Sequence, residues 1–147
     1  MHDFALHPRL AADTVEITRL PLCRVLLMND ANYPWLILVP QRPQLRELFE
    51  LSADEQTQFM RESSQVARMM SRTFNADKIN IAALGNVVPQ LHIHHIARYT
   101  HDPAWPAPVW GRLPCVPYGE DQIRSRMERV RQALACPSEN GITSTLL

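Results

Sequence analysis

The stretch that decides the fold is Gln90-Leu-His-Ile-His-His-Ile-Ala-Arg98. It predicts a β-strand, and successive side chains of a strand point to opposite sides of a sheet. The even-numbered positions, mostly polar, share one face: His92, His94, Ile96 and Arg98. The odd-numbered positions, mostly apolar, share the other: Leu91, Ile93, His95, Ala97 and Tyr99. We expect the apolar face to rest on the core and the polar face to carry any chemistry.

Three interpretations of the polar face are open. The histidines could lie on a solvated surface, or two of them could bind a metal, because His-x-His on a strand suits two imidazole ligands. A metal site needs a third ligand, and the nearest candidates are His101, across a turn, and Asp102. The third interpretation is nucleophilic catalysis on a phosphate, in which a neutral imidazole attacks phosphorus while Arg98 and amides hold the anion. We favour it, because three of the six histidines fall within four positions beside an arginine.

The rest of the chain predicts an α+β fold, with an antiparallel sheet of about five strands and two main helices. Alternating or apolar runs indicate strands at 14–20, 23–29, 35–39, 78–83 and 91–99. The run at 35–39 is apolar on both faces and should be central. A capping box, Ser52 to Glu55, begins one helix, whose apolar stripe has helical spacing: Phe59, Ser63, Val66, Met70 and Phe74. A second helix is predicted over 120–135.

Size and composition limit the class of protein. The chain has 147 residues, which suits one domain, expected over 1–136 with a flexible tail at 137–147. Its 15 basic and 15 acidic residues balance, so it lacks the cation surplus that binding a nucleic acid polymer requires. No apolar run approaches the about 20 residues of a membrane span, and no secretory signal is evident. We therefore expect a cytoplasmic protein.

Cysteine, proline and tryptophan add two further expectations. The three cysteines are far apart and show no Cys-x-x-Cys spacing, which makes a disulfide framework or a thiolate zinc site improbable. Five prolines and two tryptophans crowd residues 103–117, so this segment should be irregular but packed. Trp105 and Trp110 are expected to form a structural belt, the alternative being a lid or dimer contact near the site.

The histidine stretch resembles the signature of the histidine triad (HIT) family, His-φ-His-φ-His-φ-φ with φ apolar. Three other features fit the resemblance: the run from Tyr33 to Arg42 resembles the family's early strand, that from Leu48 to Glu55 its entry into the long helix, and Arg98 stands where an arginine commonly follows the triad. The resemblance covers about residues 20–100. The tract from Asp102 to Gly111 resembles an uncharacterised bacterial subgroup of HIT-like proteins.

The resemblance implies a HIT-like fold, usually a homodimer, that binds a small nucleotide with its α-phosphate over the triad strand. The middle histidine, here His94, would attack the α-phosphorus and form a nucleotidyl-histidine, which water or another acceptor resolves. His92 would join the hydrogen-bond network around the phosphate and leaving group. Expected substrates are small phosphoramidates, phosphoanhydrides or dinucleoside polyphosphates, and the attack needs no metal or organic cofactor.

The resemblance also assigns binding residues and shows one departure. Asn29 and Asp30 would contact base and ribose, while Asn86, Gln90 and Arg98 would line the phosphate site. The third triad position is Ile96, where hydrolase branches have His and one transferase branch has Gln. His95 cannot replace it, because a shift of one residue moves a side chain to the opposite face. We expect His95 to be buried with one hydrogen bond. The alternative function is a catalytically weak nucleotide-binding or regulatory module.

Overall fold

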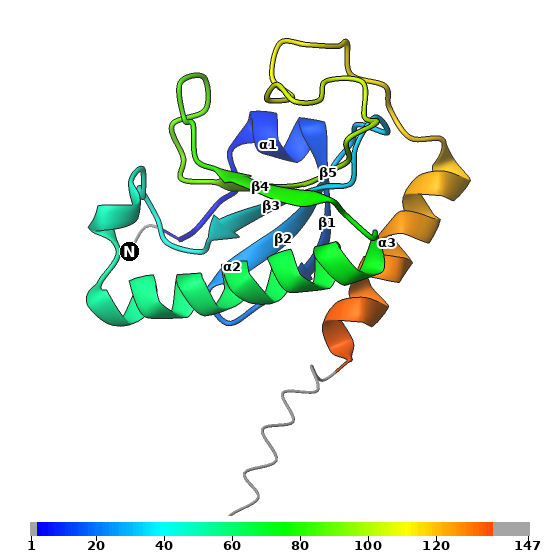
Figure 1. Cartoon of the computed structure of the whole chain (residues 1–147). Helices are drawn as coiled ribbons and strands as arrows, with labels where there is room; N and C mark the ends of the chain where they lie inside the picture. Colours follow the sequence, from blue (N-terminus) through cyan, green and yellow to red (C-terminus); the bar gives the residue numbers. More distant parts are fainter. Residues whose placement is uncertain (1–2, 137–147) are drawn as a thin grey trace, which may run out of the picture.

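The computed structural model describes residues 3–136, and its centre is one five-stranded antiparallel sheet in the order β1-β2-β3-β5-β4 (Figure 1). This confirms the predicted α+β class and places the apolar third strand in the middle of the sheet. The strands have the following bounds: β1 Thr14–Arg19, β2 Cys23–Met28, β3 Trp35–Pro40, β4 Lys78–Ala82 and β5 Ile93–Arg98. The predicted tail at 137–147 lies outside the described residues.

Helices and irregular chain cover both faces of the sheet. The long helix α2 (Ala53–Thr73) and the helix α3 (Glu120–Ala135) lie on one side, as Figure 1 shows. The short helix α1 (Pro8–Asp13) and the irregular segment 99–119 lie on the other. A single 3-10 turn, η1 (Leu48–Glu50), precedes α2.

The larger core lies between the sheet and α2. The Ser52–Glu55 capping box is formed as predicted and begins the helix. The predicted stripe is confirmed, since all five of its side chains are buried: Phe59, Ser63, Val66, Met70 and Phe74. From α3, Val130 is fully buried in the same core, and Ile123 and Met127 pack against it.

A second apolar core lies on the opposite face, where α1 and the 99–119 segment cover the sheet. Its buried members come from α1, from the sheet and from the 99–119 segment, and they include Leu10, Trp35, Ile37, Ile96 and Val109. The histidine face of β5 is therefore enclosed rather than solvated. The interpretation of these residues as surface histidines is wrong, because β5 is an inner strand whose six residues are all buried.

Two local features differ from the sequence prediction. The helix α1 was not predicted; it is only six residues long and begins with Pro8 at its first turn, where the His7 side chain accepts a hydrogen bond from the Arg9 amide. The last strand begins at Ile93 and not at Leu91, because the amide of Leu91 donates to the carbonyl of Leu45 instead. A six-residue helix carries too little periodicity for a sequence pattern to reveal.

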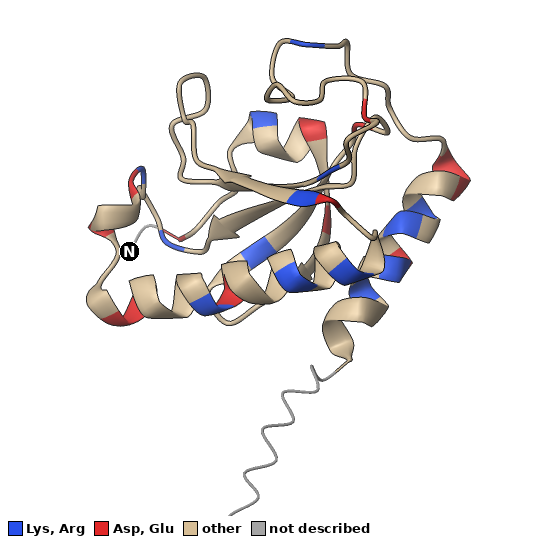
Figure 2. Ribbon diagram, in the orientation of Figure 1, with Lys and Arg blue, Asp and Glu red and all other residues tan. Residues whose placement is uncertain are grey.

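Charged residues of both signs occur on the two main helices. Figure 2 shows basic and acidic positions on both α2 and α3, in keeping with the balanced composition. Within residues 3–136, the helices are all too short or too polar to cross a membrane.

A buried ion pair holds the 99–119 segment against the sheet. Arg98 and Asp102 are joined by two hydrogen bonds, of 2.8 and 3.1 Å, and their side chains are 2% and 3% exposed. The Asp102 carboxylate also accepts from the amides of Tyr99, Ala104 and Trp105. Burial raises the pKa of Asp102, but the Arg98 guanidinium and these amides lower it more, to about 2. The carboxylate is therefore charged at neutral pH.

We predict that Asp102→Asn destabilises the protein by about 3–5 kcal/mol, because it leaves the buried guanidinium without its counter-charge. The measurement is the free energy of unfolding in urea. The control is Asp121→Asn, which breaks an exposed pair with Arg124 and should cost at most about 1 kcal/mol. Equal losses in the two variants would contradict a structural role for the buried pair.

Candidate functional site

Two histidines and two tryptophans form one cluster on the enclosed face of the sheet. The ring centroids of His92 and His94 are 5.0 Å apart, and those of His94 and Trp35 are 5.5 Å apart. Trp110, from the 99–119 segment, lies edge-on to His94 at 5.2 Å. Each histidine is 7% exposed. His94 is thus enclosed by aromatic rings, while His92 lies beside it just before β5 begins.

The partner of His94 determines which of its nitrogens carries a proton. The indole Nε1 of Trp35 donates to Nδ1 of His94 at 3.0 Å, and an indole N–H can only donate. Burial, together with the neighbouring His92 and His95, lowers the pKa of His94 to about 3. The ring is therefore neutral at neutral pH, with its single proton on Nε2.

In His92 the proton is on the other ring nitrogen. Its Nδ1 lies 2.7 Å from the main-chain carbonyl oxygen of Gln90. A carbonyl oxygen can only accept, so Nδ1 carries the proton and, in the neutral ring, the lone pair is on Nε2. The two adjacent rings thus offer different groups at Nε2: a lone pair on His92 and an N–H on His94.

This difference argues against His94 as the attacking ring. A nucleophile needs a free lone pair, and the hydrogen bond from Trp35 occupies the lone pair that His94 has. His92 meets the requirement, and His94 offers a hydrogen-bond donor beside it.

The other residues predicted for the phosphate are placed differently. The side chain of Gln90 is engaged by the N-terminal segment: its Oε1 accepts from the amide of His7 and its Nε2 donates to the carbonyl of Ala5, both at 2.8 Å. Gln90 contributes to the histidine pair through its main-chain carbonyl. Asn86 lies exposed in the loop that precedes His92.

Asn29 and Asp30 lie towards the other end of the sheet from Gln90. Gln90 precedes β5, beyond the point where Ile93 pairs with Leu38 of β3. Asn29 and Asp30 follow β2, beyond the point where Leu27 pairs with Leu36 of β3. Their side-chain oxygens accept from the 99–119 segment: Asn29 from the amide of Tyr118 at 2.9 Å, and Asp30 from the amide of Val116 at 3.4 Å. The structure thus separates these two residues from Gln90 and places them at the end of the sheet where Trp35 pairs with Ile96 and Arg98 follows.

Arg98 also has another role. Besides its two bonds to Asp102, the guanidinium donates to Oδ1 of Asn80 and to the carbonyl of Ala107, each at 2.8 Å. Four of the five N–H groups of a guanidinium are thereby used, and the residue is 1% exposed. This arrangement argues against a phosphate contact, because Arg98 is committed to anchoring the segment that covers the site.

His95 points to the α2 side, as strand alternation predicts, and is fully buried. It has two hydrogen-bond partners and not one: Ser63 Oγ at 2.7 Å and the carbonyl of Ile93 at 3.1 Å. Burial lowers its pKa to about 4, although the carbonyl of Ile93 acts in the opposite direction. His95 is a structural residue of the α2-side core.

The comparisons with known proteins agree with this architecture. The family model described as HIT domain matches residues 9–101, which is more than half of the chain. The chain belongs to the HIT family.

Solved structures with the HIT fold resemble the chain along most of its length. A histidine triad protein of Bradyrhizobium japonicum is 46% identical, with a TM-score of 0.88 over 90% of this chain and 99% of that one. A histidine triad protein of Marinobacter aquaeolei VT8 is 51% identical, with a TM-score of 0.88 over 90% and 97%. A hypothetical histidine triad nucleotide-binding protein of Sulfolobus tokodaii is 12% identical, with a TM-score of 0.64 over 82% and 83%, and shares the fold alone. Among curated proteins, none matches significantly.

Sequence reasoning missed the most direct partner of the HIT histidines. The sequence places Trp35 in the apolar central strand and in the stretch that resembles the HIT early strand, without a contact to the histidines. Its position nevertheless has the parity that brings it to the histidine face, because Ile37 pairs with His94 and Trp35 is two residues away. Trp110 lies at the site, as the lid alternative proposed, whereas Trp105 lies over the Arg98 guanidinium at 5.7 Å.

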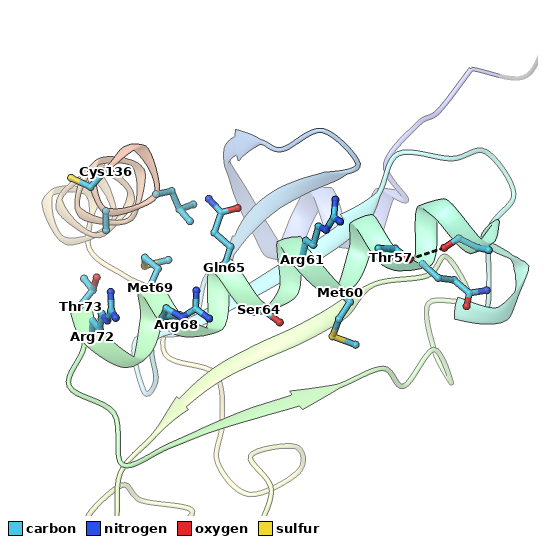
Figure 3. Close-up of a pocket in the computed structure, with 14 residues that line it drawn as sticks. Thr57, Met60, Arg61, Ser64, Gln65, Arg68, Met69, Arg72, Thr73 and Cys136 are labelled. Atoms are coloured by element: carbon cyan, nitrogen blue, oxygen red, sulfur yellow. Dashed lines mark hydrogen bonds between the residues drawn. The ribbon is translucent and has the colours of Figure 1, made fainter. Parts of the chain in front are cut away.

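Two hollows in the described part of the chain are not lined by His92 or His94. The larger, of about 1110 Å³, lies between α2 and the end of α3 and is shown in Figure 3. Its labelled side chains include three arginines of α2: Arg61, Arg68 and Arg72. The smaller, of about 440 Å³, lies at the start of α3. The histidine pair of this HIT protein is covered, because both residues are buried.

The metal interpretation lacks its third ligand in the described part of the chain. No group of three or more His, Cys, Asp or Glu there lies close enough to hold a metal ion. His101 and Asp102, the candidates from the sequence, are engaged elsewhere: the His101 ring packs on Tyr99 at 5.3 Å, and Asp102 binds Arg98.

We predict that the stability of this HIT protein falls between pH 7 and pH 5. In that range an unfolded histidine, with a pKa of about 6.5, binds a proton, whereas folded His94 and His95 remain neutral with pKa values of about 3 and about 4. The unfolded state then binds more protons, so the free energy of unfolding drops by about 2 kcal/mol for each ring.

Urea unfolding at the two pH values measures this drop. His95→Gln should remove about half of the part that the two rings contribute, and exposed His101→Gln should leave the wild-type drop intact. If His95→Gln and His101→Gln show the same pH dependence, the buried ring does not titrate as the structure implies.

Proposed function

We propose that this HIT protein is an enzyme that binds a small nucleotide and transfers its nucleotidyl group through a covalent nucleotidyl-histidine. The observation that carries the proposal is the histidine pair, in which a lone pair and an N–H are presented by rings 5.0 Å apart. One tetrahedral phosphate can lie within hydrogen-bonding distance, about 3 Å, of both rings. Membership of the HIT family supports the same chemistry, and one protein of this fold is described as nucleotide-binding.

The attacking group in this proposal is His92. Its Nε2 lone pair forms a bond to the α-phosphorus, and the bond from that phosphorus to the leaving group breaks, with the electron pair going to the leaving group. The ring becomes cationic, and its Nδ1–H bond to the carbonyl of Gln90 stabilises that charge. Water or another acceptor then attacks phosphorus and loses its proton to solvent, while the bond from phosphorus to Nε2 breaks and its electron pair returns to His92.

His94 acts as a fixed hydrogen-bond donor in this step. Its Nε2–H stabilises the negative charge that develops on a non-bridging phosphate oxygen. Since its pKa is about 3, it holds no extra proton to give a leaving group at neutral pH. The site therefore favours leaving groups that depart as anions, as in phosphoanhydrides and dinucleoside polyphosphates, over phosphoramidates of basic amines.

Access to the pair requires part of its cover to move. Both rings are 7% exposed, and the side chain of Gln90 fastens residues 5–7 across the same end of the sheet. Asn86 lies in the loop next to this point, exposed to solvent, and is our candidate for contacting a phosphate that enters there.

The second candidate function is a nucleotide-binding or regulatory module without efficient turnover. Two observations favour it: the covered state of the histidine pair, and Ile96, which is fully buried in the apolar core where the resemblance expects a third polar residue.

A single-turnover reaction with a fluorogenic adenylyl substrate distinguishes the two functions, with the covalent adduct on the protein detected by mass spectrometry. We predict that His92→Ala loses both adduct and product. His94→Ala should still form adduct, about 10²–10³-fold more slowly, as for the loss of one oxyanion donor. Exposed His101→Ala is the control and should behave as wild type.

Two results would overturn parts of this scheme. If wild type releases product at the background rate while a nucleoside monophosphate still binds, the protein is a binding module. If His94→Ala abolishes the adduct and His92→Ala retains it, the roles of the two rings are reversed.

We also propose a homodimer, as the family resemblance implies. Within the described residues, β4 is an edge strand of the sheet, and Ile81 on it is 51% exposed. Such an edge offers unpaired main-chain groups to a second chain. Light scattering should give about twice the 16.9 kDa of one chain, and Ile81→Lys should shift the mass towards the monomer. A monomeric wild type would contradict this proposal.

A further inference from the structure

We propose that Trp35 is a positioning residue that fixes the proton of His94 on Nε2 and so makes His94 a permanent hydrogen-bond donor. Its catalytic consequence rests on the proposed function, whereas the position of the proton is a property of the free protein. The two can therefore be tested separately.

The strand register brings the two side chains together. In the pairing of β3 with β5, Ile37 is opposite His94 and Trp35 is opposite Ile96. Trp35 is thus the diagonal neighbour of His94 on the same face, a separation that large aromatic side chains can bridge. The result is the 3.0 Å bond from the indole Nε1 to Nδ1 of His94.

Because Trp35 is buried, its hydrogen bond determines the tautomer of His94. Trp35 is 5% exposed, and a buried indole N–H needs an acceptor. If the proton of His94 moved to Nδ1, two N–H groups would face each other at 3.0 Å and the indole would lose its acceptor. A doubly protonated ring would create the same conflict. Trp35 therefore opposes both the other tautomer and the imidazolium form.

The aromatic neighbours keep Trp35 in this position. Tyr33 lies edge-on to it with ring centroids 6.3 Å apart, and Trp110 does so at 5.9 Å. Trp110 also packs edge-on against His94. Trp35 and Trp110 thus contact the same imidazole in different ways: Trp35 through a hydrogen bond, Trp110 through ring packing. This makes Trp110 the matched control for Trp35.

The two rings therefore have different roles in the proposed reaction. The carbonyl of Gln90 holds the proton of His92 on Nδ1, and the indole of Trp35 excludes it from the same nitrogen of His94. Opposite partners thus give two chemically identical side chains opposite functions at Nε2. Trp35 touches no reacting atom in this scheme and acts through His94.

The test is ¹⁵N NMR of the full chain labelled in histidine and tryptophan, at pH 7.5 and without ligand. In wild type we expect the shifts of an unprotonated Nδ1 and a protonated Nε2 for His94, the reverse for His92, and a scalar coupling across the hydrogen bond between Trp35 Nε1 and His94 Nδ1. Trp35→Phe should move the two nitrogen shifts of His94 towards each other. Trp110→Phe should leave them unchanged.

Activity provides the second measurement. In the single-turnover reaction, Trp35→Phe should lower the rate of adduct formation by about tenfold, less than the about 10²–10³-fold expected for loss of the donor itself. The affinity for nucleoside monophosphate should remain unchanged. Trp110→Phe should keep the wild-type tautomer whatever it does to the rate.

The outcomes distinguish the proposal from the proposed function. The inference is overturned if wild-type His94 carries its proton on Nδ1, if the coupling to Trp35 is absent, or if Trp35→Phe leaves the shifts of His94 unchanged. The wild-type spectrum decides the first two points even if Trp35→Phe fails to fold. If the tautomers are as expected but wild type forms no adduct, the positioning role stands and the enzymatic function fails.

Discussion

The enclosure of β5 on both faces is the constraint on which the rest of the structure depends. Its six residues are all buried, yet three of them carry polar side chains, and a buried polar group without a partner is costly. Each therefore has a dedicated partner from another element. His94 is bonded by Trp35, His95 by Ser63, and Arg98 by Asp102. These partners join β5 to β3, to α2 and to the segment that covers the sheet.

The same constraint determines the chemistry of the two neighbouring rings. Water can donate and accept, so a solvated histidine exchanges its tautomers freely. A carbonyl can only accept and an indole N–H can only donate. Because His92 lies beside the carbonyl of Gln90 and His94 lies beside Trp35, the two identical side chains differ at Nε2: His92 has a lone pair there and His94 has a proton. Exclusion of water makes that difference permanent and strengthens any hydrogen bond to an anion at the site.

Runs of apolar and alternating residues predicted the sheet and its central strand, and strand alternation predicted that His92 and His94 share one face while His95 lies on the other. Neither pattern could identify partners, because these depend on the register between strands far apart in the chain. Trp35 is 59 residues from His94. The partners that argue against a phosphate contact of Arg98 could not be identified for the same reason, since Asp102 and Asn80 approach it from a turn and from a neighbouring strand. Asn29 likewise meets Tyr118, 89 residues away.

Gln90 and Arg98, on either side of the histidine pair, each bind a segment that lies over the sheet. Gln90 precedes the pair and holds the N-terminal segment through its side-chain amide. Arg98 follows it and holds the 99–119 segment through Asp102 and the carbonyl of Ala107. Of the four even-numbered polar residues from 90 to 98, His92 and His94 form the ring pair, whereas Gln90 and Arg98 bind the segments that enclose it. A side-chain substitution at either end therefore affects the rings indirectly, because their exclusion from solvent depends on the segments that Gln90 and Arg98 hold in place.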